Sequence, residues 1–385
     1  MPHDHTVLSE ILKHVPHARF EELIQAHGAD GGSRRLDSRT QLVALLYGQL
    51  SGASGLRAIV TELESHAATL AELGCDPVKR STLAEANRHR PAALFGDLLA
   101  AVMAQAHRGL RRHVKETTYL IDSTSVSLSA LSERWARFSA TACGAKAHLV
   151  FDPDADRPVY AAVTPARVTD LTAAKAMPIE AGATYVFDLG YYDYRWWATL
   201  QAAGCRIVTR FKTNTPLTVA EERSVPPPTP DGGVILSDRT GRLPERQASR
   251  RKNPFQAQVR EVRVRIETGK TLRILSNDLE ASAQDIADLY KRRWAIELFF
   301  RWVKQTLNIR HFVGTSENAV RLQIAVALIA FVLLRLAQAT QSAIESPLAF
   351  ARLVRTNLMH RRRIDQLLHP PTQRRRPAGP QQAPA

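Results

Sequence analysis

The spacing of apolar residues divides the chain into a helical first part, a middle part that alternates as strands do, and a helical last part. Up to about residue 113, apolar residues recur every three or four positions, which is the period of an amphipathic helix. The clearest such segment is 38–50, and its apolar face is formed by Leu42, Leu45, Leu46 and Leu50. Glycine-containing turns such as 51–55 separate the segments. We therefore predict an all-α unit over residues 1–113.

The third helix of this unit, at 81–90, carries polar and basic residues, among them Asn87, Arg88 and Arg90. Short helices joined by tight turns, with such a helix last, are typical of helix-turn-helix DNA-binding domains. We therefore expect residues 1–113 to bind DNA through these three side chains. The alternative is a plain helical bundle in which the same residues form a solvated basic edge.

From residue 117 the apolar period changes from that of a helix to that of a strand. The segments predicted as strands are 117–121, 146–151, 158–163, 184–187 and 205–211, and those predicted as helices are 171–180 and 194–200. Three strands, a helix, a strand, a helix and a strand follow one another in this order in ribonuclease-H-like α/β folds. We predict the first part of such a catalytic core at 114–211, with its first and fourth strands side by side.

Residues 212–280 interrupt this core with a different pattern. A proline-rich stretch at 226–230 precedes a short strand at 234–236 and a hairpin made of 259–266 and 272–275. Arg263 and Arg265 occupy one face of the hairpin, where they either contact phosphate or are simply solvated. We predict a mainly β insertion, after which the catalytic core resumes over 281–345.

The stretch 285–307 contains neither glycine nor proline and is predicted as one helix. At about 100° per residue, four polar residues fall on one narrow stripe beside an apolar seam; they are Tyr290, Arg293, Glu297 and Lys304. Aromatic residues cover much of the remaining circumference, namely Trp294, Phe299 and Trp302, so we expect the helix to be buried on most sides. The simplest interpretation of the stripe is a structural ion pair of Arg293 with Glu297.

An apolar helix is predicted from residue 316 to about 339, and a basic tail occupies 346–385. The most apolar run, 324–334, is shorter than the roughly 20 residues that span a bilayer, so we expect a core helix and no membrane partner. The first residues lack the apolar core of a signal peptide. The tail contains arginine triplets at 361–363 and 374–376, and we predict that it is largely disordered and contacts nucleic acid without sequence preference.

Composition narrows the class of partner. With 52 Lys and Arg against 37 Asp and Glu, the formal net charge is +15 and the isoelectric point is near 10.2, values that are unusual for an enzyme of small metabolites. A polyanion, above all nucleic acid, is the expected partner. The three cysteines are far apart and lack the spacing of metal ligands, which favours buried thiols in a reducing compartment.

Three carboxylates are candidates for one shared site. They are Asp122 after the first strand, Asp188 after the fourth, and Glu297 on the later helix. Adjacent strands bring the two aspartates together, and clustered carboxylates repel one another unless cations neutralise them. Hard oxygen ligands suit Mg²⁺ or Mn²⁺, and two such ions can align the attacking and leaving oxygens of a phosphodiester. We therefore predict a site for two Mg²⁺ or Mn²⁺ ions held by these three carboxylates.

The spacing Tyr290-x2-Arg293-x3-Glu297-x6-Lys304 resembles the YREK signature of DDE transposases of the insertion-sequence-four family. The segments YLIDSTSV and FDLGYYD are similar to those that hold the first and second aspartates of that family. QLVALLYGQLSGASGLRAIV and STLAEANRHR resemble the N-terminal helical domain of one of its branches. The resemblance implies that Asp122, Asp188 and Glu297 bind metal and catalyse. It also implies that Tyr290, Arg293 and Lys304 hold phosphates of the cleaved strand.

The resemblance further implies a transposase of a bacterial insertion sequence that cuts and pastes its element. Such an enzyme binds the terminal inverted repeats and target DNA, acts as a homodimer in the active complex, and works in the cytoplasm with the nucleoid. Two alternatives remain: a ribonuclease-H-like nuclease without strand transfer, and a DNA-binding protein that has lost catalysis. Residues 212–280 lack the tryptophan with which some relatives support a hairpin route, and Lys146 and His148 have no assigned role.

Overall fold

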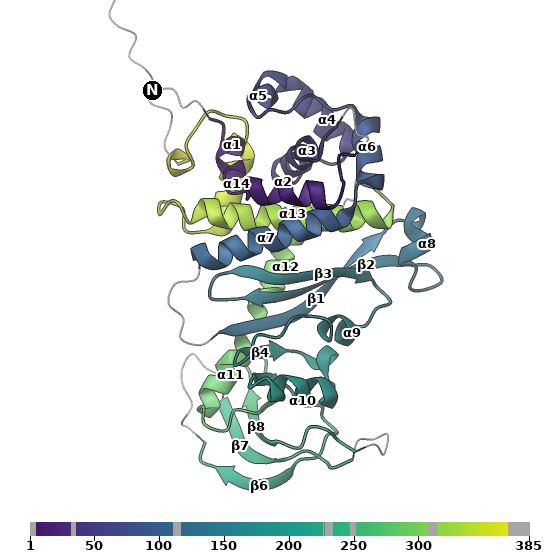
Figure 1. Ribbon diagram of the computed structural model, residues 1–385. Coiled ribbons are helices and arrows are strands. Elements are labelled where there is room, and N and C mark those ends of the chain that lie inside the picture. Colours follow the sequence, from purple (N-terminus) through teal and green to yellow (C-terminus); the bar gives the residue numbers. More distant parts are fainter. Residues whose placement is uncertain are drawn as a thin grey trace, which may run out of the picture.

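The computed structural model describes residues 5–31, 36–110, 117–225, 227, 234–246, 252–306 and 314–368. The chain forms one nine-stranded sheet. A thick helical layer lies over one face of its first strands, and short helices lie on the other face (Figure 1). The first five strands are β1 Thr118–Leu128, β2 Cys143–Asp152, β3 Arg157–Pro165, β4 Thr184–Phe187 and β5 Arg206–Arg210. Their order across the sheet is β3-β2-β1-β4-β5.

Strands β1, β4 and β5 are parallel, whereas β1, β2 and β3 form antiparallel hairpins. This is the arrangement of a ribonuclease-H-like core, and it confirms the predicted fold class. The first and fourth strands are neighbours, as expected from the sequence. Strand β1 is longer than predicted, because β2 pairs with it from Leu120 to Leu128. The helix predicted at 171–180 is only α9, Asp170–Ala174.

The insertion continues the same sheet. Its strands are β6 Thr218–Arg223, β7 Val234–Arg242, β8 Gln258–Arg265 and β9 Thr271–Ser276. Strand β9 pairs antiparallel with β5, so the sheet extends in the order β5-β9-β8-β7-β6. Strand β6 was not predicted, since its residues are mostly exposed and give no apolar alternation.

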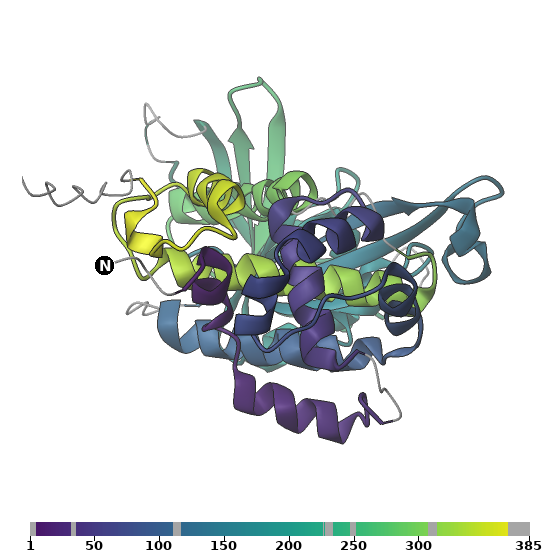
Figure 2. The ribbon, with the colours of Figure 1, turned by 90° about the horizontal axis from the view of Figure 1, so that it is seen from above.

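The helical layer combines the first helices of the chain with the last. They are α1 Val7–Leu12, α2 His17–Ala26, α3 Ser38–Ser51, α4 Leu56–Ser65, α5 Ala67–Glu72, α6 Arg80–His89, α7 Ala92–Leu110, α13 Glu317–Gln338 and α14 Pro347–Asn357. Helix α13 crosses the molecule beneath the N-terminal helices (Figure 2) and shares one hydrophobic core with them. The described helices from α1 to α7 therefore share their core with a helix of the catalytic part.

The other face of the sheet is covered by α9 and by α10, Tyr194–Ala202. This side has its own aromatic core, in which Phe187, Trp196 and Trp197 pack together. Short helical segments complete the chain: η1 Ala130–Ser132, α8 Glu133–Ala136, η2 Leu189–Tyr191 and η3 Ile364–Gln366. Because side chains alternate along a strand, successive residues of β1 face different cores.

The stretch predicted as one helix is two, α11 Ala283–Arg292 and α12 Trp294–Thr306. The helices meet at Arg293, whose N–H bonds to the carbonyl of Tyr290, while the N–H of Ile296 bonds to the carbonyl of Arg293. Bonds across three residues replace bonds across four, so the helix tightens there. No glycine or proline marks this point in the sequence.

The tail was predicted to be largely disordered from residue 346, and this is wrong for its first part. Helix α14 packs against α3 and α13, and Phe350, Ala351 and Val354 are buried. Arg361 forms an ion pair with Glu72 of α5. The second arginine triplet, 374–376, lies outside the described residues.

Helix α13 is long and apolar enough to cross a membrane, yet 89% of its most apolar window is buried inside the protein. Helix α13 is therefore a core helix, as predicted.

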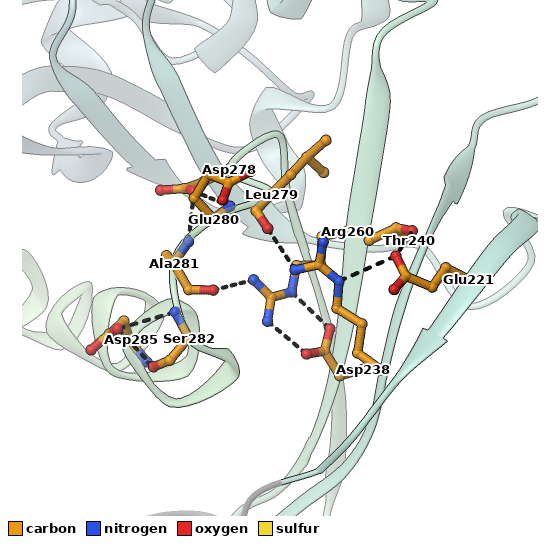
Figure 3. Close-up of polar contacts among 11 residues, drawn as sticks. Glu221, Asp238, Thr240, Arg260, Asp278, Leu279, Glu280, Ala281, Ser282 and Asp285 are labelled. Atoms are coloured by element: carbon orange, nitrogen blue, oxygen red, sulfur yellow. Dashed lines mark hydrogen bonds and ion pairs between the residues drawn. The ribbon is translucent and has the colours of Figure 1, made fainter.

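A buried ion pair ties the insertion to the start of α11 (Figure 3). The Arg260 guanidinium donates to both oxygens of Asp238, at 2.7 and 2.6 Å, and also to the carbonyl of Ala281. Arg223 donates to the carbonyl of Leu279. Ser282 then caps α11 with a reciprocal capping box. The strands of the insertion thus fix where the helix that leads to Arg293 begins.

Candidate active site

Asp122 and Asp188 lie side by side in the sheet. Strands β1 and β4 are parallel with Ile121 paired to Phe187, and the two aspartates are the next residues on their strands. Asp122 shares the sheet face of Leu120, which packs in the core of the helical layer. Its carboxylate therefore points towards the side on which α12 lies.

A main-chain N–H orients each aspartate. The N–H of Ser123 donates to Asp122 Oδ1 at 2.8 Å, and the N–H of Gly190 donates to Asp188 Oδ1 at 2.7 Å. Each carboxylate has one oxygen fixed by the backbone, and the second oxygen of Asp122 is directed at α12.

Glu297 reaches the same place from α12. The Arg293 guanidinium donates through Nη2 to Glu297 Oε1 and lies 3.5 Å through Nη1 from Asp122 Oδ2. The ion pair of Arg293 with Glu297 that helical spacing predicts is therefore present. It extends beyond the helix, because a carboxylate 171 positions away in the sequence shares the same arginine.

The electrostatics of this group favour a cation. Burial raises the pKa of Asp122 from 3.8 to about 6, and the charges of Asp188 and Glu297 add to this rise, while the Ser123 N–H and Arg293 oppose it. Burial lowers the pKa of Arg293, but Tyr290, Glu297 and Asp122 outweigh it, so the net shift is upward. Arg293 therefore neutralises the negative charge of Asp122 only in part.

The three carboxylates suit a hard divalent ion in ligand chemistry. Among the described residues, however, no three His, Cys, Asp or Glu side chains are grouped closely enough to hold an ion as they stand. The guanidinium of Arg293 bridges Asp122 and Glu297 and so occupies the place of a cation between them. The carboxylates therefore suit a divalent ion in donor chemistry, and in this structure the guanidinium holds two of them instead.

The remaining residues of the polar stripe flank this group. Tyr290 is buried at the end of α11, and the Arg293 guanidinium lies 5.9 Å from the centre of its ring. Lys304 is half-buried on α12, two turns beyond Glu297. The prediction that the helix is buried on most sides is wrong, because Trp294 and Leu298 are 55% and 54% exposed. These two apolar side chains lie on the exposed side of α12.

Two residues predicted to contact DNA are placed in the interior. Asn87 and Arg90 are 2% and 6% exposed. Gln41 binds both of them, and Asn318 of α13 donates to both of their carbonyls. Their polar groups hold the N-terminal helices to α13, so the prediction of a DNA contact is corrected for these two. Arg88, between them, is exposed.

Sequence reasoning missed Asp170. Its carboxylate accepts hydrogen bonds from Ser123 and from Lys146, beside His148. In the sequence it follows Thr169, which caps α9, and an acidic residue there is usual because it complements the helix dipole. Only the pairing of β1 with β2 brings these residues together.

Comparisons with known proteins identify the family of this chain. A family model described as the transposase DDE domain matches residues 113–333, and one described as a domain of unknown function (DUF4372) matches residues 3–76. A Sinorhizobium fredii protein named as a transposase is 40% identical over 75% of this chain and 80% of its own length. A Geobacillus stearothermophilus protein named as a transposase for an insertion sequence element is 30% identical over 66% of each chain.

Among solved structures, a piggyBac transposase synaptic complex with hairpin DNA aligns with 96% of this chain and 83% of that chain. The TM-score is 0.48 and the identity 12%, a similarity too weak to support a conclusion.

Proposed function

Because the chain belongs to the family of DDE transposases, we propose that Asp122, Asp188 and Glu297 are its catalytic triad. A transposase of this family cleaves DNA and transfers the cut strand. The observation that carries the assignment is the Arg293 guanidinium, which joins Asp122 of β1 to Glu297 of α12. Asp188 follows the end of the neighbouring strand β4. An inactive DNA-binding protein would have no need of such a group.

The family normally uses divalent metal ions, and we assign two Mg²⁺ or Mn²⁺ ions to this triad. Bound there, the ions would activate the attacking oxygen and stabilise the leaving oxygen of the phosphodiester. The two aspartates are already oriented by the main chain. The N–H groups of Ser123 and Gly190 each donate to Oδ1 of one aspartate. The Oδ2 atom of each aspartate would then bind the ion.

Arg293 exchanges partners in this scheme. In the structure it neutralises Asp122 and Glu297, and a divalent cation would make that charge redundant. Released from the carboxylates, the guanidinium is suited to a DNA phosphate, which it binds with two parallel hydrogen bonds. Tyr290 and Lys304 flank it and would hold neighbouring phosphates of the cut end.

The partners follow from the same assignment. The DNA is double-stranded and comprises the terminal inverted repeats of a bacterial insertion sequence and the target. Arg88 on α6 belongs to the surface that binds these ends, and two copies of the chain pair them in the active complex. Cut-and-paste transposition on the nucleoid places the enzyme in the cytoplasm.

The assignment is tested with DNA that carries the inverted repeats flanking the gene. Purified wild-type protein with Mg²⁺ should cut the repeat ends, leave a 3′-hydroxyl and join it to a second duplex. Asp188→Asn should bind the same DNA with unchanged affinity and cut nothing. Cutting by this variant, or by wild type in EDTA, would refute the triad, and cutting without joining would favour a simple nuclease.

A further inference from the structure

A second polar cluster lies directly behind the first catalytic aspartate. Asp170, the first residue of α9, accepts a hydrogen bond from the Ser123 hydroxyl at 2.7 Å and one from Lys146 Nζ at 3.1 Å. His148 Nδ1 stands 3.7 Å from the same carboxylate oxygen, and its Nε2 is 2.8 Å from the Thr164 hydroxyl. Ser123 and His148 are directly opposed in the β1–β2 ladder.

This cluster is on the opposite face of the sheet from the catalytic carboxylate. Successive strand residues point to opposite faces, so Ser123 shares the face of Ile121 and Asp122 shares that of Leu120. Lys146 and His148 share the face of Val150, which packs with Ile121 in the aromatic core. Asp170 therefore lies behind the strand that carries Asp122.

Ser123 connects the two faces. Its hydroxyl donates to Asp170 Oδ1, and its own N–H donates to Asp122 Oδ1 at 2.8 Å. By fixing the Ser123 side chain, Asp170 also fixes the Ser123 N–H that orients the Asp122 carboxylate. Lys146 also donates to the carbonyl of Val168 at 3.3 Å, which fixes the loop that delivers Asp170.

Asp170 also lies against the segment of the second aspartate. A Cβ atom added at Gly190 would come within 3.5 Å of Asp170 Oδ2 and 3.0 Å of Asp188 Oδ1. Next to it, Tyr191 is buried, and the charges of Asp122, Asp170 and Asp188 all act on its hydroxyl. One carboxylate therefore stands between the segments that carry both catalytic aspartates.

A purely structural role for Asp170 does not account for this arrangement. Helix α9 already has a side-chain cap, Thr169, and is only five residues long, so it gains little from an additional acid. His148 is buried and Lys146 is half-buried, and apolar side chains would cost less to desolvate there unless the pairing has a use.

We propose that Asp170, paired with Lys146, is a positioning residue that holds Asp122 in its metal-binding orientation through Ser123. The inference rests on the proposed metal site at Asp122, Asp188 and Glu297. Removing one group that orients a metal ligand typically weakens metal binding by about 10- to 100-fold. Asp170 and Ser123 act in series, so the loss of either should break the same connection.

The test measures Mn²⁺ binding to the full chain without DNA, from the electron paramagnetic resonance signal of the unbound ion. Ser123→Ala and Asp170→Ala should each weaken Mn²⁺ binding by about 10-fold, and the double variant should lose no more than either alone, as expected for one shared path. Asp170→Asn keeps the acceptor oxygen and should restore most of the affinity. Glu133→Gln, in the ion pair of Glu133 with Arg137 at 2.6 Å, is the control and should bind as wild type does.

Unchanged binding by Ser123→Ala, or additive losses in the double variant, would overturn the inference while leaving the triad intact. If Asp170→Ala fails to fold, Ser123→Ala decides alone, because it removes one hydroxyl and no charge. Failure of the wild type to bind Mn²⁺ would overturn the proposed metal site and this inference with it.

Discussion

Replacing Asp122 by asparagine should stabilise the metal-free protein while abolishing cleavage. The Asp122 side chain is 19% exposed, and the carboxylates of Asp188 and Glu297 repel its charge. Asparagine keeps the shape and the oxygen that accepts from the Ser123 N–H, and it removes the charge. A buried charge that destabilises the fold is expected at a functional site, where a bound ion neutralises it.

The magnitude follows from the pKa. Folding raises the pKa of Asp122 from 3.8 to about 6, so the folded state binds the proton more tightly than the unfolded state. This stabilising contribution is complete below pH 3.8 and is lost as the pH rises through about 6. At about 1.4 kcal/mol per pH unit, the loss at pH 7.5 is about 3 kcal/mol, and at pH 5 about half of that. These are upper values, because Arg293 loses one of its two carboxylate partners in the variant.

The assay is urea unfolding of both proteins in EDTA, at pH 5 and at pH 7.5. Asp122→Asn should be more stable than wild type at both values, with the larger difference at pH 7.5. Added Mn²⁺ should raise the midpoint of the wild type, since a ligand of the native state stabilises it, and should leave the variant nearly unchanged. A difference independent of pH, or a variant less stable than wild type at pH 7.5, would refute the reasoning.

Three further predictions follow from other parts of the molecule. Lys304→Ala should impair strand joining more than first-strand nicking, measured side by side on pre-nicked and intact ends, whereas equal loss with a lowered melting temperature would make Lys304 a structural residue. Arg88→Ala should weaken DNA binding and reduce the slope of log affinity against log salt by about one; an unchanged slope in a binding titration would remove Arg88 from the interface. Asp238→Ala leaves the buried Arg260 without its carboxylate and should destabilise the protein by about 3–5 kcal/mol in urea unfolding, while Glu222→Ala, in an exposed pair with Arg239, should cost under about 1 kcal/mol.

Much of the fold could be predicted because its signals are local. The strand patterns of β2 and β3, the short apolar run of β4 and the aspartates that follow two strands predict the ribonuclease-H-like order and the neighbouring carboxylates. The break at Arg293 was missed because it has no glycine or proline. Its cause is tertiary, since the arginine at the junction is held by Asp122 on β1 and by Glu297.

Other features of the site depend on partners far away in the sequence. Asn87 and Arg90 have the residue types of a DNA-reading helix, yet Asn318 and Gln41 bury them. Burial of this kind is decided by α13, which the local pattern of α6 does not reveal. Asp170 is the reverse case. Its sequence position is that of an ordinary acid in the first turn of a helix, and only the tertiary structure places Ser123 and His148 beside it.

Direct coordination by the triad is tested best by changing the softness of one ligand. In Asp188→Cys a thiolate replaces the carboxylate, and a thiolate binds Mg²⁺ poorly but accepts softer divalent ions. The variant should be inactive with Mg²⁺ and regain cleavage of the repeat ends with Mn²⁺ or Co²⁺, whereas Asp188→Ser, which has no thiolate, should stay inactive with every ion. Failure of Mn²⁺ and Co²⁺ to restore cleavage selectively to the cysteine variant would contradict the assignment of Asp188 as a metal ligand.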